Sequence, residues 1–164
     1  MEDREVPRGV ATLDGPVEVH FDGACAPPKG GGVATFGYHL EGAGYLHEDR
    51  GLAVRPYSEH ATNNVAEYVG AIRALEWLRA HGYRGPVVLV GDSQLVIRQM
   101  TGEYEVKAEH LKAYHEHLTQ LARRFRQVEF RWVRRSENVR ADALSKLALA
   151  EAGDEARRYG PDDP

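Results

Sequence analysis

Four carboxylates stand at separated points of the chain where hydrophobic alternation or helical repeat does not by itself require an acid. They are Asp22, Glu67, Asp92 and Asp142. Hard divalent cations such as Mg²⁺ prefer several oxygen ligands that converge on one point. If the fold brings these four side chains together, we expect a metal-dependent phosphoryl-transfer site.

Two predicted strands position the first and third of these acids. Residues 17–22 alternate between apolar and polar side chains, which predicts a strand that ends at Asp22. Residues 87–90 form a continuous apolar run, typical of a strand covered on both faces, and Asp92 follows it. Ligands of open α/β sheets collect outside the carboxyl ends of strands, so we expect both aspartates to face one crevice.

The remaining elements complete an α/β fold, a mixed sheet with helices packed on it. The hydrophobic pattern predicts further strands at 33–40, 44–54 and 128–132. We expect the strands at 17–22, 33–40 and 44–54 to be joined as antiparallel hairpins. The pattern also predicts helices from Thr62 or Asn63 to Ala80, from Asp92 or Ser93 to Met100, at 107–124, and at 138–150.

Each acid also has a simpler interpretation, and spacing alone does not decide between the two. Asp22 suits a turn, Asp92 or Ser93 suits a helix cap, and Asp142 suits the helix dipole. Glu67 also suits the dipole, but it borders the apolar face of its helix. A carboxylate pressed toward a core is expensive unless its charge is compensated, which a metal ion would do.

Length and composition indicate one globular domain. The 164 residues, with 42% hydrophobic and 28% charged residues, are enough for a proper core. We expect a folded domain at 17–150, between a flexible arm at 1–16 and a charged tail at 151–164. No apolar run approaches the roughly 18 residues of a membrane span. The single Cys25 excludes an internal disulfide framework and suits the cytoplasm.

The net charge of −4 is unevenly distributed along the chain. Residues 1–20 and residues 151–164 each hold five acids and two bases, so the segment between them is positive. A basic cluster there fits phosphate contacts, and it equally fits a solvated surface. Its members are Arg123, Arg124, Arg126, Arg131, Arg134, Arg135, Arg140 and Lys146.

The neighbours of the four acids resemble the four signature blocks of type 1 ribonuclease H. The blocks are Phe21-Asp22-Gly23-Ala24-Cys25, Thr62-Asn63-Asn64-Val65-Ala66-Glu67, Gly91-Asp92-Ser93-Gln94 and Glu137-Asn138-Val139-Arg140-Ala141-Asp142. They occur in the family's order with similar gaps, across roughly residues 17–150. The resemblance implies the ribonuclease H-like fold, a five-stranded mixed sheet with three antiparallel strands followed by two parallel ones, flanked by helices.

The resemblance also implies an activity and a metal requirement. Members of the family cleave the RNA strand of RNA–DNA hybrids, leave 5′-phosphate and 3′-hydroxyl ends, and thereby remove RNA primers and R-loops. The tetrad of Asp22, Glu67, Asp92 and Asp142 would hold two Mg²⁺ ions, or Mn²⁺ as a substitute. Asp22 would bridge both ions with Asp92 beside it, Glu67 would also touch the 2′-hydroxyl, and Asp142 would complete the second ion's ligands.

The same blocks imply a substrate-binding set. Asn63, Asn64 and Gln94 match the family's polar positions in the hybrid groove, although Asn63 also suits a helix cap. RNA differs from DNA at a site only by its 2′-hydroxyl, so strand choice needs such donors and acceptors. The other implied members of this set are Gly23, Cys25, Ser93, Arg135 and Asn138. We expect an RNA–DNA hybrid as partner, with no membrane and no obligatory protein partner.

The sequence departs from the family pattern in three places. No histidine follows His117, so the mobile histidine of many members is missing, as in the short-loop archaeal-like branch, and Arg135 is a candidate to take over part of its role. The basic helical protrusion of several bacterial members is replaced by the short link 101–107. Residues 27–29 are Pro-Pro-Lys where relatives commonly have Asn-Pro-Gly, which puts hybrid affinity and selectivity against double-stranded RNA in question.

Two other classes of function stay open at this point. One is a non-catalytic hybrid- or nucleic-acid-binding domain on the same fold, although a binder gains little from presenting four anions to phosphates. The other is a different nuclease of the superfamily, such as a proofreading exonuclease. Those usually carry Asp-x-Glu in the first block, whereas Asp22 is followed by Gly23 and Ala24. We expect Trp77 and Trp132 to be packing residues.

Overall fold

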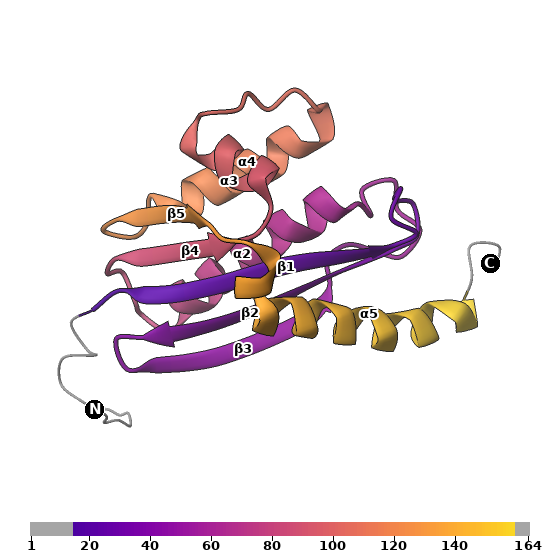
Figure 1. Cartoon of the computed structure of the whole chain (residues 1–164), viewed down its shortest axis with the longest axis horizontal. Helices are drawn as coiled ribbons and strands as arrows, with labels where there is room; N and C mark the ends of the chain where they lie inside the picture. The colour runs from indigo at the N-terminus through magenta and orange to yellow at the C-terminus, as the bar shows by residue number, and fades with distance from the viewer. Residues whose placement is uncertain (1–14, 160–164) are drawn as a thin grey trace.

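A five-stranded mixed sheet forms the centre of the protein (Figure 1). The computed structural model describes residues 15–159, and the side chains of residues 15–153. The strands lie in the order β3-β2-β1-β4-β5. The pairs β1–β2 and β2–β3 are antiparallel, and β1–β4 and β4–β5 are parallel, which confirms the predicted topology. Their bounds are β1 Val17–Ala26, β2 Val33–Gly42, β3 Tyr45–Leu52, β4 Val87–Gly91 and β5 Val128–Trp132.

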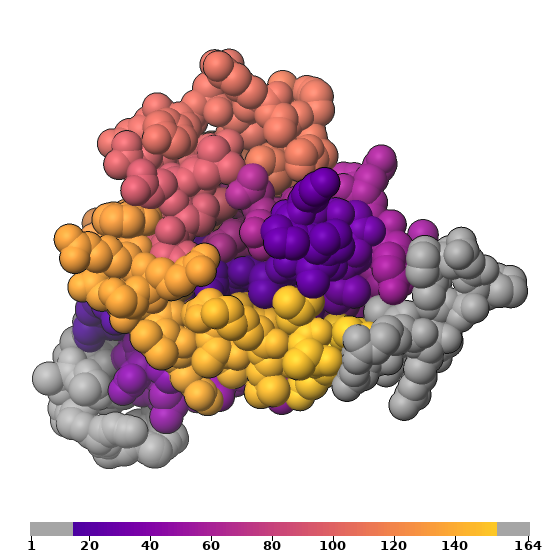
Figure 2. Space-filling view, turned by 45° about the vertical axis from the view of Figure 1, so that its right-hand side comes forward, coloured from indigo at the N-terminus to yellow at the C-terminus, as the bar shows by residue number. Residues whose placement is uncertain are grey.

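Helices cover the sheet from both sides. Helix α2 packs on β1 and β2, with α3 and α4 beside it, whereas α5 crosses β1, β2 and β3 on the opposite face (Figure 1). Their bounds are α2 Asn63–Ala80, α3 Gln94–Thr101, α4 Glu109–Ala122 and α5 Val139–Tyr159, with a 3₁₀ turn η1 at Arg135–Glu137. The outer side of α5, orange to yellow in Figure 2, lies at the surface of the molecule. None of the helices in residues 15–159 has the length and apolar character needed to cross a membrane.

The two faces of β1 carry different kinds of residue. Val17, Val19 and Phe21 point to the α2 side and are fully or almost fully buried there with the apolar face of α2. Asp22 lies opposite Gly37 of β2, on the face that α5 covers. The hydrophobic core therefore lies on the α2 side of β1, and the first acid of the tetrad points away from it.

Two element boundaries differ from the sequence prediction by more than two residues, the end of β1 and the end of α5. Strand β1 does not end at Asp22 but continues to Ala26, because its outer half still pairs with β2 after its pairing with β4 ends at His20. Helix α5 does not end at residue 150 but continues to Tyr159, into the segment we expected to be a tail. Residues 1–14 of the expected arm and 160–164 of the expected tail lie outside the described residues.

Helix α5 approaches the sheet very closely at Gly37. A Cβ atom at this position would lie 2.6 Å from the backbone nitrogen of Ser145 and 2.7 Å from Cβ of Leu144. Next to this contact, the Thr35 hydroxyl donates a hydrogen bond of 2.7 Å to the carbonyl oxygen of Ser145. The absence of a side chain at Gly37 thus lets the helix that carries Asp142 lie directly on the sheet beside Asp22.

Replacing Gly37 with alanine should therefore displace α5 and destabilise the protein. Forcing an extra methyl group into a close-packed contact costs about 1–3 kcal/mol. Gly51→Ala is the matched control, because a Cβ there would meet only the Phe36 ring, at ordinary contact distances of 3.5 and 3.7 Å. Urea unfolding of both variants measures the difference. Equal free energies of unfolding for the two variants would contradict the close-contact explanation.

Candidate active site

Three of the four acids meet at the carboxyl end of β4. Asp22 from β1, Glu67 from α2 and Asp92 from the β4–α3 connection each offer a carboxylate oxygen, and these oxygens lie within 4.8 Å of one another. Asp22 is 2% exposed and Glu67 is 7% exposed. Asp22 and Asp92 thus come together as predicted, with Glu67 as the third member, although only Glu67 and Asp92 of the three line the cleft itself.

Gly23 allows α2 to bring Glu67 next to Asp22. A Cβ atom at position 23 would lie 2.7 Å from both the Cβ of Ala66 and the backbone nitrogen of Glu67. The Gly23 amide also donates a hydrogen bond of 2.9 Å to Asp22 Oδ1. Gly23 therefore has a structural function at this contact in addition to its predicted place in the substrate-binding set.

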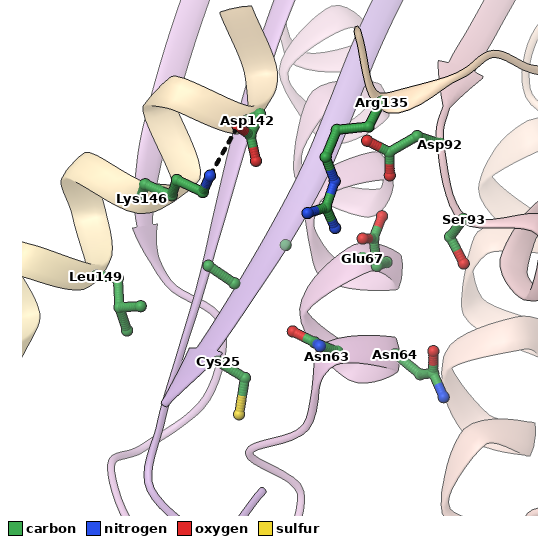
Figure 3. A pocket seen from close by; sticks show the side chains of 12 residues that line it. Cys25, Asn63, Asn64, Glu67, Asp92, Ser93, Arg135, Asp142, Lys146 and Leu149 are labelled. Atoms are coloured by element: carbon green, nitrogen blue, oxygen red, sulfur yellow. Dashed lines mark ion pairs between the residues drawn. The ribbon is translucent and has the colours of Figure 1, made fainter. Parts of the chain in front are cut away.

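The start of α2 resolves one alternative left by the sequence. The Thr62 hydroxyl accepts a hydrogen bond of 3.2 Å from the Val65 amide, so Thr62 is the N-cap. The Asn63 side chain is free of that task and lies at the cleft (Figure 3). Glu67 stands one turn further along the helix, on its buried side.

The main chain around Asp92 is held by neighbouring side chains. Ser93 caps α3 by accepting a hydrogen bond of 3.1 Å from the Val96 amide, so the cap is Ser93 and not Asp92. The Trp132 indole donates a hydrogen bond of 3.1 Å to the carbonyl oxygen of Asp92. Trp132 is 41% exposed, so it is not the buried packing residue that we expected.

Asn138 ties the last helix to the first strand. Its amide donates a hydrogen bond of 2.9 Å to the carbonyl oxygen of Phe21, the residue before Asp22. Asn138 is only 1% exposed and also contacts Asp92, where it opposes the increase in pKa that burial causes. These contacts assign Asn138 to holding the site together, and its predicted contact with substrate stays a prediction.

Burial and mutual repulsion disfavour the charged forms of the three acids. Burial raises the pKa of Asp22 to about 7, and the charge of Asp92 adds to the increase. Burial, followed by the charge of Asp22, raises the pKa of Glu67 well above its ordinary value. Burial also raises the pKa of Asp92, although Asn138 and the charge of Arg135 act against it.

The side chains present fit a hard divalent cation. Glu67 Oε1 and Asp92 Oδ2 are buried and have no hydrogen-bond partner among the described residues. Buried oxygens of this kind are costly unless something compensates them. Carboxylate oxygens are the ligands preferred by Mg²⁺ and Mn²⁺, so a cation bound between them would compensate both oxygens and the repulsion.

The fourth acid lies at the same cleft but outside this cluster. Asp142 stands in the first turn of α5, and its Oδ2 is 3.1 Å from Nζ of Lys146 (Figure 3). The cleft has a volume of about 380 Å³, and Glu67, Asp92 and Asp142 all line it. The structure therefore brings three predicted ligands together, with the fourth at the edge of the same space.

Most of the predicted substrate-binding residues surround this cleft. Gly23, Cys25, Asn63, Asn64, Ser93 and Arg135 all line it. Arg135 extends from η1 toward Asp92 and Glu67 (Figure 3). Gln94 is exposed at the first position of α3. The Cys25 thiol donates to the carbonyl oxygens of Pro27 and Ala61, each at 3.2 Å.

Lys146 and Leu149 also line the cleft, and sequence reasoning did not single them out as site residues. Lys146 was assigned only to the general basic cluster. Its spacing of four residues from Asp142 on one helix could have indicated the contact. No comparable signal in the sequence indicated that Trp132 is exposed. The alternation of residues in β5 does not reveal that the indole bonds to the main chain at Asp92, just after the neighbouring strand β4.

Comparison with families and curated proteins gives consistent matches. Residues 45–148 match the family model described as reverse transcriptase-like. The bifunctional protein Rv2228c of Mycobacterium tuberculosis is 40% identical over 96 residues, covering 58% of this chain and 26% of that protein. The chain therefore spans about a quarter of the length of the first curated relatives it matches.

Two further relatives match over most of this chain. Ribonuclease HI of Halobacterium salinarum is 36% identical over 139 residues, which is 84% of this chain and 66% of the relative. Ribonuclease H of Pelobacter propionicus is 30% identical over 151 residues, which is 83% of this chain and 86% of the relative.

Solved structures share the fold. The N-terminal RNase H domain of Rv2228c, solved as a fusion with maltose-binding protein, has a TM-score of 0.76 and 30% identity, and the match covers 86% of this chain and 98% of that one. LC11-RNase H1, solved in complex with an RNA/DNA hybrid, has a TM-score of 0.72 and 31% identity, covering 83% and 98%.

Removing the charge of Asp22 should stabilise the metal-free protein at neutral pH. The folded state holds a proton on Asp22 up to about pH 7, whereas the unfolded state releases it near pH 4. Folding stability from this group therefore falls as pH rises through that window. In EDTA at pH 8, Asp22→Asn should gain on the order of 2 kcal/mol, with little gain at pH 4.

Urea unfolding at both pH values measures this gain. Asp49→Asn is the control, since Asp49 is an exposed aspartate on β3. Saturating Mg²⁺ should reverse the order, so that the wild type becomes more stable than Asp22→Asn. A wild type that is more stable than Asp22→Asn in EDTA at pH 8 would contradict the repulsion argument.

Proposed function

Because this chain belongs to the ribonuclease H family, as a type 1 member, we propose that it hydrolyses the RNA strand of RNA–DNA hybrids with two bound divalent metal ions. The observation that carries this proposal is the meeting of Asp22, Glu67 and Asp92 oxygens within 4.8 Å at the floor of an open cleft. Two divalent cations, Mg²⁺ or Mn²⁺, held by Asp22, Glu67, Asp92 and Asp142 would supply an activated water and stabilise the leaving oxygen.

The proposed roles follow the positions of the acids. Asp22 interacts with both other acids, since a hydrogen bond with Glu67 and the charge of Asp92 both affect its pKa. It would therefore suit the bridging role. Glu67, with one buried oxygen that has no hydrogen-bond partner among the described residues, would hold one ion and contact the 2′-hydroxyl beside the scissile phosphate. Asp142, which also lines the cleft, would complete the ligands of the second ion.

The polar rim of the cleft supports the proposed choice of strand. Asn63 and Asn64 at the start of α2 and Ser93 before α3 offer donors and acceptors on both sides of the acids (Figure 3). Such groups can sense a 2′-hydroxyl, which separates RNA from DNA at a site. Arg135 adds a positive charge next to Asp92, where a phosphate with its counter-ions would lie.

We further propose that cleavage leaves 5′-phosphate and 3′-hydroxyl ends, and that the protein removes RNA primers and R-loops in the cytoplasm. The link from β5 to α5 contains only residues 133–138, with no histidine. Arg135, which reaches into the cleft from this link, is our candidate for the role that the loop histidine has in other members. The match with Rv2228c covers only 26% of that longer protein, so the proposal concerns the matching domain and not the activity of such a protein as a whole.

Replacing one cluster acid should strongly slow cleavage while the fold is retained. Several kcal/mol of transition-state stabilisation depend on the bound cations, so Asp92→Asn should lower the cleavage rate about 10²–10³-fold. The assay incubates labelled RNA–DNA hybrid, double-stranded RNA and single-stranded RNA with Mg²⁺, Mn²⁺ or EDTA. We expect hybrid cleavage with Mg²⁺ or Mn²⁺, none in EDTA, and no cleavage of single-stranded RNA.

Asp49→Asn again serves as the matched control, because this aspartate stands on β3 and not at the cleft. Undiminished cleavage by Asp92→Asn would reject the metal cluster as the active site. Tight binding of hybrid without cleavage under every metal condition would favour a non-catalytic binding domain instead.

A further inference from the structure

Asp142 and Lys146 form an ion pair inside the cleft. Lys146 Nζ lies 3.1 Å from Asp142 Oδ2, and both residues line the cleft together with Glu67 and Asp92. They are four residues apart on α5, which places them on one side of the helix. In Figure 3 the ion pair lies across the cleft from Glu67 and Asp92.

The main chain of Asp142 is fixed, so only its side chain can change partner. Its amide donates a hydrogen bond of 3.1 Å to the carbonyl oxygen of Asn138. Its own carbonyl oxygen accepts a hydrogen bond of 2.9 Å from the Ser145 hydroxyl, and Ser145 is fully buried against the sheet. The carboxylate of Asp142 is close enough to the cluster to act on Asp22, whose pKa, raised first by burial, it raises further, while Oδ2 is paired with Lys146.

The charges in the cleft make two cation positions unequal. Asp22, Glu67 and Asp92 already lie within 4.8 Å of one another, so they can receive one divalent cation with no change at α5. A second cation needs oxygens of Asp142, and one of these is already bonded to the Lys146 ammonium. The second cation must therefore displace a positive charge that the first does not meet.

We propose that Lys146 is a built-in counter-cation for Asp142 that competes with the second divalent metal ion, so that the two ions bind with clearly different affinities. This inference rests on the proposed two-metal function of the same cleft. The lysine side chain is 63% exposed and that of Asp142 is 22% exposed. Exposed ion pairs of this kind are weak, so Lys146 weakens the second site without closing it.

Two variants at position 146 test the competition directly. Lys146→Gln keeps a similar length and removes the charge, whereas Lys146→Arg keeps the charge. Lys112→Gln is the matched control, since it removes the ammonium that contacts Glu109 at 2.7 Å on α4, away from the cleft. Each protein, stripped of metal, is titrated with Mn²⁺ alone, and free Mn²⁺ is followed by electron paramagnetic resonance.

The wild type should show one tighter and one weaker Mn²⁺ site. In Lys146→Gln the weaker site should bind about three- to tenfold more tightly, where tenfold corresponds to about 1.4 kcal/mol. The tighter site should change less than about twofold, because it does not use Asp142. Lys146→Arg and Lys112→Gln should both behave like the wild type.

Three results would overturn the proposal. They are a single Mn²⁺ site or two equal sites in the wild type, an unchanged or weakened second site in Lys146→Gln, and an equal shift of both sites. Because the titration contains no nucleic acid, its result is independent of hydrolysis. Two unequal sites that respond to Lys146→Gln, in a protein that cleaves no hybrid, would reject the proposed function and keep this inference.

Discussion

Repulsion between buried carboxylates is the constraint on which the rest of this structure depends. Asp22, Glu67 and Asp92 bring oxygens within 4.8 Å of one another, and two of the three side chains are almost completely buried. Burial, with the charge of Asp92 adding to it, raises the pKa of Asp22 to about 7, so without a cation the site is relieved by holding protons. The surrounding fold must offset this cost, and it does so through close packing and through hydrogen bonds to the main chain.

That packing depends on glycines at two positions and on side-chain hydrogen bonds to the main chain at two others. Gly23 lets α2 approach β1, and Gly37 lets α5 approach β2, so helices pack closely on both faces of the sheet beside Asp22. Asn138 then fixes the carbonyl of Phe21, and Trp132 fixes that of Asp92. The geometry of the acids is thus imposed by main-chain contacts, which leaves the carboxylate oxygens free for ligands.

The sequence predicted the elements well where one periodic pattern acts alone. The apolar run at 87–90 and the helix from Thr62 to Ala80 agree with the structure because burial of a strand and of a helix face leaves a direct signal. The extension of β1 to Ala26 was missed because it depends on pairing with β2, a partner distant in sequence. The exposure of Trp132 was missed for the same reason, since it depends on tertiary neighbours. The contact of Lys146 with Asp142 is local to α5, and its spacing of four residues could have indicated it.

The hydrogen bond between Asn138 and Phe21 joins residues 117 positions apart, and Thr35 and Ser145 are joined across 110 positions. Contacts of such large sequence separation form late, because the chain must lose the entropy of closing a long loop first. During synthesis from the N-terminus, β1 to β5 emerge from the ribosome before α5 does. The nascent chain therefore carries an incomplete cleft until nearly the whole domain has been made, and the cleft acquires its last wall only when α5 docks.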